Sequence, residues 1–112
     1  MNKLTQKRCR PCEGGTTPLG AETAETLLEQ LHPDWQLSSD SQAIERLFRF
    51  SDFHKTMAFV NALAWIAHEE DHHPDLEVGY NRCTVRYTTH AINGLSENDF
   101  ICAAKTDALF QD

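Results

Sequence analysis

Three histidines lie where one predicted element gives way to the next. His72 and His73 are adjacent in HEEDHHPDLEVGY at 68–80, between an acidic run and Pro74, and His90 follows at the end of a predicted strand. An imidazole exchanges its proton near neutral pH, so one ring can accept a proton while another donates one. Adjacent side chains diverge within a regular element, but at a helix-to-loop junction two rings can flank one small ligand. These residues therefore indicate acid–base chemistry.

Each of these positions also has a purely structural interpretation. His73, before Pro74, can end a helix, where an imidazolium suits the negative end of the helix dipole. His90 can be an exposed residue at the end of a strand. The spacing of Ser96 and Asp99 matches a capping box for a last helix. From the spacing alone, capping is the favoured role for Asp99, and neither role is favoured for the histidines.

Metal binding is a separate hypothesis. Zinc sites use three or four nitrogen, sulfur or oxygen ligands. The ligand types are present in His72, His73 and His90 with Glu69 or Asp71, but those three histidines contain no H-x-x-x-H or H-x-H spacing. The sequence therefore gives only a weak metal signal at this position.

The N-terminal cysteines raise a second metal hypothesis. Cys9 and Cys12 form a C-x-x-C, which is either a redox pair or half of a zinc site. His68 would be a third ligand of a small zinc protein, and it also stands four residues before His72, at helical spacing. A redox C-x-x-C is expected at a strand-to-helix junction, whereas this one lies in an irregular segment. Acid–base chemistry remains the stronger hypothesis, and no metal is predicted.

Composition limits the class of protein. The 112 residues, 40% hydrophobic and 24% charged, fit one globular domain, expected at 18–112 after an irregular segment at 1–17. A net charge of −7 argues against nucleic-acid binding, and the few basic residues near the N-terminus are expected to form a solvated tail. No apolar run reaches the ~20 residues of a membrane span, and no secretory signal is recognised. A cytoplasmic location is the default expectation.

Two hairpins are predicted from alternating hydrophobicity. A helix from Pro18 to about Leu31 precedes the first, which covers 35–50 around a polar turn at 38–41. The second hairpin covers 76–91. The residues expected to share a buried side are Ile44, Phe48 and Phe50 in the first hairpin and Cys83, Val85 and Tyr87 in the second.

A long helix between the hairpins is the most secure element. Ser51 is its expected N-cap and Pro74 its end, and a last helix starts at Ser96. The order α-β-β-α-β-β-α predicts an α+β fold, a four-stranded antiparallel sheet with helices on one face. The apolar stripe of the long helix comprises Phe53, Met57, Val60, Ala64 and Ala67, widened by Phe59, Leu63 and Ile66.

Several motifs together resemble the pterin-4a-carbinolamine dehydratase family. They are DHHPDL at 71–76, Tyr80, TTHA at 88–91 and GLSENDF at 94–100, within a likeness that runs from about 35 to 109. The resemblance implies a hydro-lyase that dehydrates 4a-hydroxytetrahydrobiopterin to quinonoid dihydropterin and so recycles the cofactor of aromatic amino acid hydroxylases. One proton must reach the departing 4a-hydroxyl and one must leave a ring nitrogen, which implies no metal and no other cofactor.

The resemblance also implies roles for individual residues. His72, His73 and His90 fall on the family's catalytic histidines, with His73 expected as the general base and the other two binding the carbinolamine. Asp99 would orient a histidine while capping the last helix. His68 departs from the family, which usually has an acidic residue there. The pterin site is expected to comprise His72, His73, Pro74, Thr89, His90, Ala91 and Ile92.

Partners follow from the resemblance as well. It implies a pterin substrate, a homodimer or homotetramer, and a functional link to a phenylalanine hydroxylase, with no nucleic acid and no membrane. The alternatives are a non-enzymatic module that assembles through an edge strand or binds a partner, and a role in molybdopterin metabolism. An inert relative should have lost one of His72, His73 or His90, and this chain retains all three.

Overall fold

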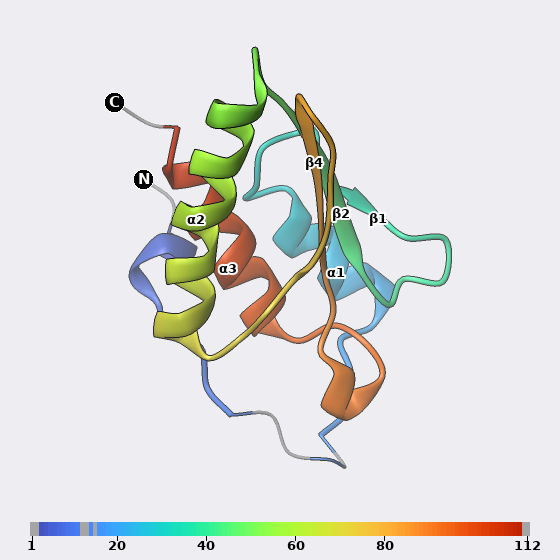
Figure 1. Cartoon of the computed structure of the whole chain (residues 1–112). Coiled ribbons are helices and arrows are strands. Elements are labelled where there is room, and N and C mark those ends of the chain that lie inside the picture. Colours follow the sequence, from blue (N-terminus) through green and yellow to red (C-terminus); the bar gives the residue numbers. More distant parts are fainter. Residues whose placement is uncertain (1–2, 12–13, 15, 111–112) are drawn as a thin grey trace.

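The computed structural model describes residues 3–11, 14 and 16–110. Along these residues the predicted order α-β-β-α-β-β-α is confirmed, with two short 3-10 helices added (Figure 1). The elements are η1 (Lys3–Gln6), α1 (Ala21–Leu28), β1 (Gln36–Leu37), β2 (Ile44–Arg49), α2 (Phe53–Glu70), β3 (Asp75–Val78), β4 (Arg82–Tyr87), η2 (His90–Ile92) and α3 (Glu97–Ala108).

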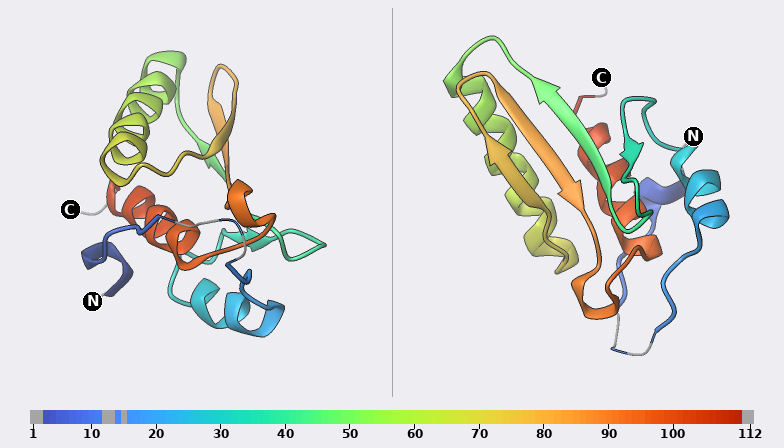
Figure 2. Two further views of the ribbon diagram at one scale, coloured as in Figure 1. Left: turned by 90° about the horizontal axis from the view of Figure 1, so that it is seen from below. Right: turned by 90° about the vertical axis from the view of Figure 1, so that its right-hand side faces the viewer.

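The four strands form one antiparallel sheet in the order β1-β2-β4-β3. The expected alternation holds in the two central strands, where Ile44 and Phe48 of β2 and Cys83 and Val85 of β4 are buried. Helices α2 and α3 cover this buried face, and the right-hand view of Figure 2 looks onto the other face, which no helix covers. The predicted α+β class is confirmed.

Helix α3 lies at the centre of the molecule. It contacts both α2 and η1, and every residue from 98 to 104 is buried. Its C-terminal half is tied to the sheet through Asp107, which accepts hydrogen bonds from the Trp35 indole at 2.9 Å and from Arg46 at 2.7 Å. The helix that carries Asp99 is therefore held from several sides.

The ends of two helices differ from the sequence prediction. Helix α1 starts at Ala21, three residues after Pro18. The N-cap of α2 is Asp52 rather than Ser51, because the Asp52 carboxylate accepts the Lys55 amide at 2.8 Å. In both helices the first residue differs from the prediction, and the architecture is unchanged.

The buried face of α2 is also rotated from the predicted stripe. Thr56, Phe59, Leu63 and Ala67 are buried, whereas Phe53 is 49% exposed. Ala64 is likewise exposed. Helix α2 carries apolar residues on several sides, so packing against the neighbouring elements determines which side is buried.

The N-terminal segment is not the solvated tail expected from its charge. Leu4 of η1 is 1% exposed and belongs to the core, and Lys7 pairs with Glu97 of α3 at 2.7 Å. The described part of this segment therefore packs on the domain. Cys12 lies outside the described residues.

Candidate active site

A cavity of about 550 Å³ opens where the end of α2, the end of β4 with η2, and the N-terminal segment meet. Its lining mixes apolar and polar surface, and the polar groups include acidic side chains at the end of α2 and the imidazoles. The lining residues are Cys9, Arg10, Pro11, Glu69, Glu70, Asp71, His72, His73, Thr88, Thr89, His90, Ala91 and Asn98.

The end of α2 aims His72 into the molecule. Asp71 adopts the left-handed conformation, with φ 50° and ψ 43°, and the His72 amide bonds back to the Ala67 carbonyl at 3.2 Å. This is the usual way in which a helix closes its last carbonyls and reverses the chain. The helix therefore ends at Glu70, before Pro74 is reached, because the αL residue rather than the proline stops it.

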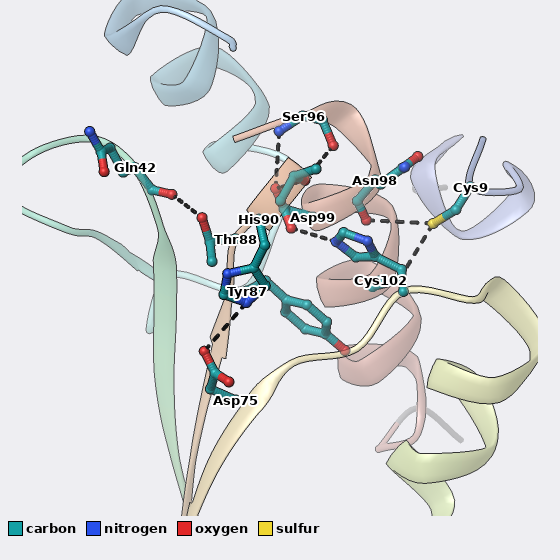
Figure 3. A network of polar contacts seen from close by, with 12 residues as sticks. Cys9, Gln42, Asp75, Tyr87, Thr88, His90, Ser96, Asn98, Asp99 and Cys102 are labelled. Carbon is teal, nitrogen blue, oxygen red and sulfur yellow. Dashed lines mark hydrogen bonds and ion pairs between the residues drawn. The ribbon is translucent and has the colours of Figure 1, made fainter. Parts of the chain in front are cut away.

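His72 contacts a fully buried carboxylate. Its Nε2 lies 2.6 Å from Asp99 Oδ1, the Asp99 side chain is 0% exposed and the His72 side chain 12% exposed. Asp99 Oδ2 accepts the Thr89 hydroxyl at 2.8 Å and the Ser96 amide at 3.0 Å. Figure 3 shows Asp99 at the centre of this network, beside Ser96 at the start of α3. One side chain thus caps α3 and holds the imidazole.

The donors around Asp99 fix the direction of the network. Thr89 donates to Asp99, so at the 2.7 Å contact between the Thr89 and Ser96 hydroxyls it is Ser96 that donates. A carboxylate only accepts, so His72 Nε2 must carry the hydrogen. In the neutral ring Nδ1 is then the unprotonated nitrogen, which is the atom able to accept a proton.

Tyr87 supports the same imidazole. Its ring lies nearly parallel to that of His72, with 8° between the planes and 6.1 Å between centroids, and its hydroxyl contacts that of Thr106 at 3.2 Å. Burial raises the pKa of Tyr87. The hydroxyl therefore remains protonated, and Tyr87 acts as a wall for His72.

His73 and His90 lie at the exposed side of the cavity. His90 does not end a strand as expected. Strand β4 stops at Tyr87, and His90 opens the 3-10 turn η2, after Thr89 has paired with Gly94. The His90 side chain is 74% exposed, and its Nε2 is 3.9 Å from Asp75 Oδ2, too far for a hydrogen bond.

The sequence prediction and the cavity overlap in part. His72, His73, Thr89, His90 and Ala91 line it, whereas Pro74 and Ile92 do not. Ile92 is buried at 8% exposure beneath η2. The sequence did not predict that residues 9–11 and Asn98 line the cavity. They lie about 88 positions apart, and no local sequence pattern indicates a contact over that separation.

The metal hypotheses have little support in the described part of the chain. No three His, Cys, Asp or Glu side chains there converge as metal ligands would. Cys9 lies against Cys102, and the His68 ring packs against that of Trp65 with the centroids 5.4 Å apart and the planes tilted by 35°. Among the described residues no helix is both long and apolar enough to cross a membrane.

Curated relatives match almost the whole chain. A protein of Nitrosomonas eutropha is 61% identical over 106 residues, covering 95% of this chain and 92% of its own. A protein of Legionella pneumophila is 55% identical over 109 residues, covering 97% of this chain and 96% of its own. Both are named, provisionally, as pterin-4-alpha-carbinolamine dehydratases.

Solved structures show the same fold. A transcriptional coactivator/pterin dehydratase from Brucella melitensis superposes with a TM-score of 0.78 at 34% identity, covering 83% of this chain and 98% of that one. A pterin dehydratase-like protein identified as a RuBisCO assembly factor superposes with a TM-score of 0.62 at 26% identity, covering 72% and 94%. The family model for pterin 4 alpha carbinolamine dehydratase matches residues 17–109. The chain therefore belongs to the pterin-4-alpha-carbinolamine dehydratase family of hydro-lyases.

Proposed function

We propose that this protein dehydrates 4a-hydroxytetrahydrobiopterin to quinonoid dihydropterin and water, and that its cavity histidines move the protons. The observation that carries the proposal is the contact between His72 and the buried Asp99 at the wall of the cavity. A buried carboxylate that fixes an imidazole in one tautomer is a recurring arrangement for acid–base catalysis. His73 and His90 lie at the same cavity and can serve the leaving group.

The dehydration divides into two proton movements. His72 Nδ1 takes the proton from the ring nitrogen next to C4a, and the electron pair left behind forms the carbon–nitrogen double bond. The C4a–oxygen bond breaks, and a protonated His73 or His90 gives its proton to the departing hydroxyl, which leaves as water. The family resemblance implied His73 as the base, but the Asp99 contact favours His72, because its ring lies 2.6 Å from a carboxylate oxygen whereas that of His90 lies 3.9 Å from one.

The test is the rate at which freshly generated 4a-hydroxytetrahydrobiopterin loses water, followed by absorbance. The wild-type protein should accelerate this step, and His73→Ala and His90→Ala should each slow it by roughly 10-fold or more. His54→Ala is the matched control, since His54 is exposed in the first turn of α2, and it should keep the wild-type rate. No acceleration by folded wild-type protein would overturn the proposal.

A second candidate function is partner binding without catalysis. Its support is the structural likeness to the protein described as a RuBisCO assembly factor. Such a role would not need the contact between His72 and Asp99. It would be favoured if the wild-type protein and His72→Ala gave equal, uncatalysed rates while both remained folded.

We also propose a homodimer or homotetramer, located in the cytoplasm and linked to a phenylalanine hydroxylase that releases the substrate. The exposed apolar side chains support self-association, since Trp65 on α2 is 60% exposed and Leu76 and Val78 on the edge strand β3 are 38% and 40% exposed. Light scattering coupled to gel filtration would give the mass. A monomer at micromolar concentration would contradict the assembly.

A further inference from the structure

Two thiols from opposite ends of the chain meet beside the cavity. Cys9 of the N-terminal segment and Cys102 of α3 have their sulfur atoms 3.5 Å apart (Figure 3). Cys102 lies three residues after Asp99, on the next turn of α3. In the described residues Cys83 is the remaining cysteine, buried in β4.

The backbone around Cys9 is anchored on both sides. The Cys9 amide donates to Glu70 Oε1 at 2.8 Å, and Glu70 also pairs with Arg8 Nε at 2.9 Å. On the other side the Arg10 amide donates to Asn98 Oδ1 at 3.0 Å, and the Asn98 amide group donates back to the Arg10 carbonyl at 2.6 Å. Three hydrogen bonds and one ion pair therefore fix the backbone that places the Cys9 sulfur over α3.

The two thiols differ in exposure. Cys9 is half-buried and lines the cavity, so a small molecule in the cavity can reach it, whereas Cys102 is completely buried. The hydrogen bond with Cys9 and burial both raise the pKa of the Cys102 thiol. Cys102 therefore keeps its proton, and Cys9 is the thiol that first meets a reagent.

We propose that Cys9 and Cys102 form a peroxide-oxidisable dithiol whose disulfide fastens the N-terminal wall of the cavity to α3. The Cys9 sulfur attacks one oxygen of hydrogen peroxide, the O–O bond breaks, and a sulfenic acid and one water result. The Cys102 sulfur then attacks the Cys9 sulfur, its proton joins the departing hydroxide, and a second water leaves. Two thiols lose two electrons, and the peroxide takes up both.

The link would have a measurable effect on stability. Residues 9 and 102 are 93 positions apart, so the bond would close almost the whole chain into a loop. A loop of that size restricts the unfolded chain strongly, and the disulfide is expected to raise Tm by roughly 10 °C. It would also hold Cys9, Arg10 and Pro11 against the cavity in the oxidised protein.

The experiment treats the fully reduced protein with hydrogen peroxide and maps disulfide-linked peptides by mass spectrometry. The expected result is the loss of two hydrogens, a Cys9–Cys102 linked peptide, the rise in Tm, and reversal of all three by dithiothreitol. Cys83→Ser and Cys12→Ser should retain this behaviour, and Cys9→Ser and Cys102→Ala should lose it, with folding checked by circular dichroism.

Two outcomes would overturn the proposal. One is a Cys9–Cys12 link in place of the Cys9–Cys102 link. The other is oxidation of Cys9 to sulfinic acid with no linked peptide while Cys102 remains a thiol. Cys9→Ser keeps the inference testable even if Cys102→Ala fails to fold, because Cys9 is only half-buried at the edge of the core and serine has nearly the same size. None of these readouts depends on dehydratase activity.

Discussion

At the scale of single residues, Asp99 both caps α3 and binds the His72 ring, and substitutions can separate these two roles. Asp99→Asn keeps the shape of the side chain but leaves three donors facing one remaining acceptor oxygen, so His72 loses its fixed tautomer. We expect kcat to fall by about 10²-fold with KM little changed, and its pH profile to shift. Ser96→Ala removes the hydroxyl that accepts the Asp99 backbone amide in the capping box but leaves the contact between His72 and Asp99 in place. It should cost about 1 kcal/mol of stability with a much smaller loss of kcat.

Thr89 is a positioning residue of the same network. Thr89→Val preserves the side-chain volume but removes a hydroxyl. That hydroxyl donates a hydrogen bond to Asp99 at 2.8 Å and accepts one from the Ser96 hydroxyl at 2.7 Å. The buried carboxylate then lacks one donor, which should lower stability by about 1–3 kcal/mol and lower kcat by several-fold, with a shifted pH profile. Thr84→Val, half-buried on β4, is the control. An unchanged pH profile in Thr89→Val would assign Thr89 to packing alone.

At the scale of elements, the end of α2 makes a prediction about backbone strain. Asp71 holds φ 50°, a conformation that glycine adopts without penalty. Asp71→Gly should therefore raise the free energy of unfolding by about 0.5–1 kcal/mol. Glu69→Gly, two residues earlier and within α2, should lower it by about 1 kcal/mol. Urea unfolding of both variants measures whether the free energy of unfolding rises in Asp71→Gly and falls in Glu69→Gly. Equal losses would show that the αL residue is unstrained.

The elements also show what a sequence can predict. The capping box of Ser96 and Asp99 is local, and it is present as expected. The stripe of α2 was placed on the wrong side at Phe53, because α2 carries apolar residues on several sides and only packing against α3 and β4 selects among them. His90 was placed at a strand end, but the pairing of Thr89 with Gly94 ends the strand earlier and forms η2.

At the scale of the whole molecule, the site is assembled from segments far apart in sequence. The motifs at 71–76, 88–91 and 94–100 could be joined by family resemblance, and His72 and Asp99 do meet. The wall from Cys9 to Pro11 could not be inferred, because the contacts of Cys9 span 61 to 93 positions and reach the Glu70 side chain, the Asn98 backbone and the Cys102 sulfur. The charge of the N-terminal segment suggested a solvated tail, whereas the buried carboxylate of Glu70 binds Arg8 and the Cys9 amide of that segment.

Glu70 joins three parts of the fold and makes stability depend on pH. Burial raises its pKa, but the Cys9 amide, Lys105 and Arg8 outweigh burial, so the pKa lies below its ordinary value of 4.5. Its charge therefore stabilises the fold above pH 4.5, and that contribution is lost as pH falls through the lowered pKa. Glu70→Gln should lower the free energy of unfolding by about 2 kcal/mol at pH 7 and by less at pH 3.

The measurement for Glu70 is thermal unfolding of the wild type and Glu70→Gln between pH 7 and pH 3. The gap in Tm should narrow below pH 4.5, where the wild-type carboxylate takes up its proton. Glu69→Gln, its exposed neighbour, should track the wild type throughout. A gap that is constant with pH would mean that packing, rather than charge, gives Glu70 its role.

The central claim is that the imidazole held by Asp99 is the base, and the dehydration rate of His72→Ala beside that of His73→Ala tests it most directly. Both proteins are compared with the wild type at equal folded concentration on freshly generated 4a-hydroxytetrahydrobiopterin. The account predicts that His72→Ala loses on the order of 10²–10⁴-fold in kcat and His73→Ala loses less. A wild-type rate in His72→Ala, or a larger loss in His73→Ala, would contradict it.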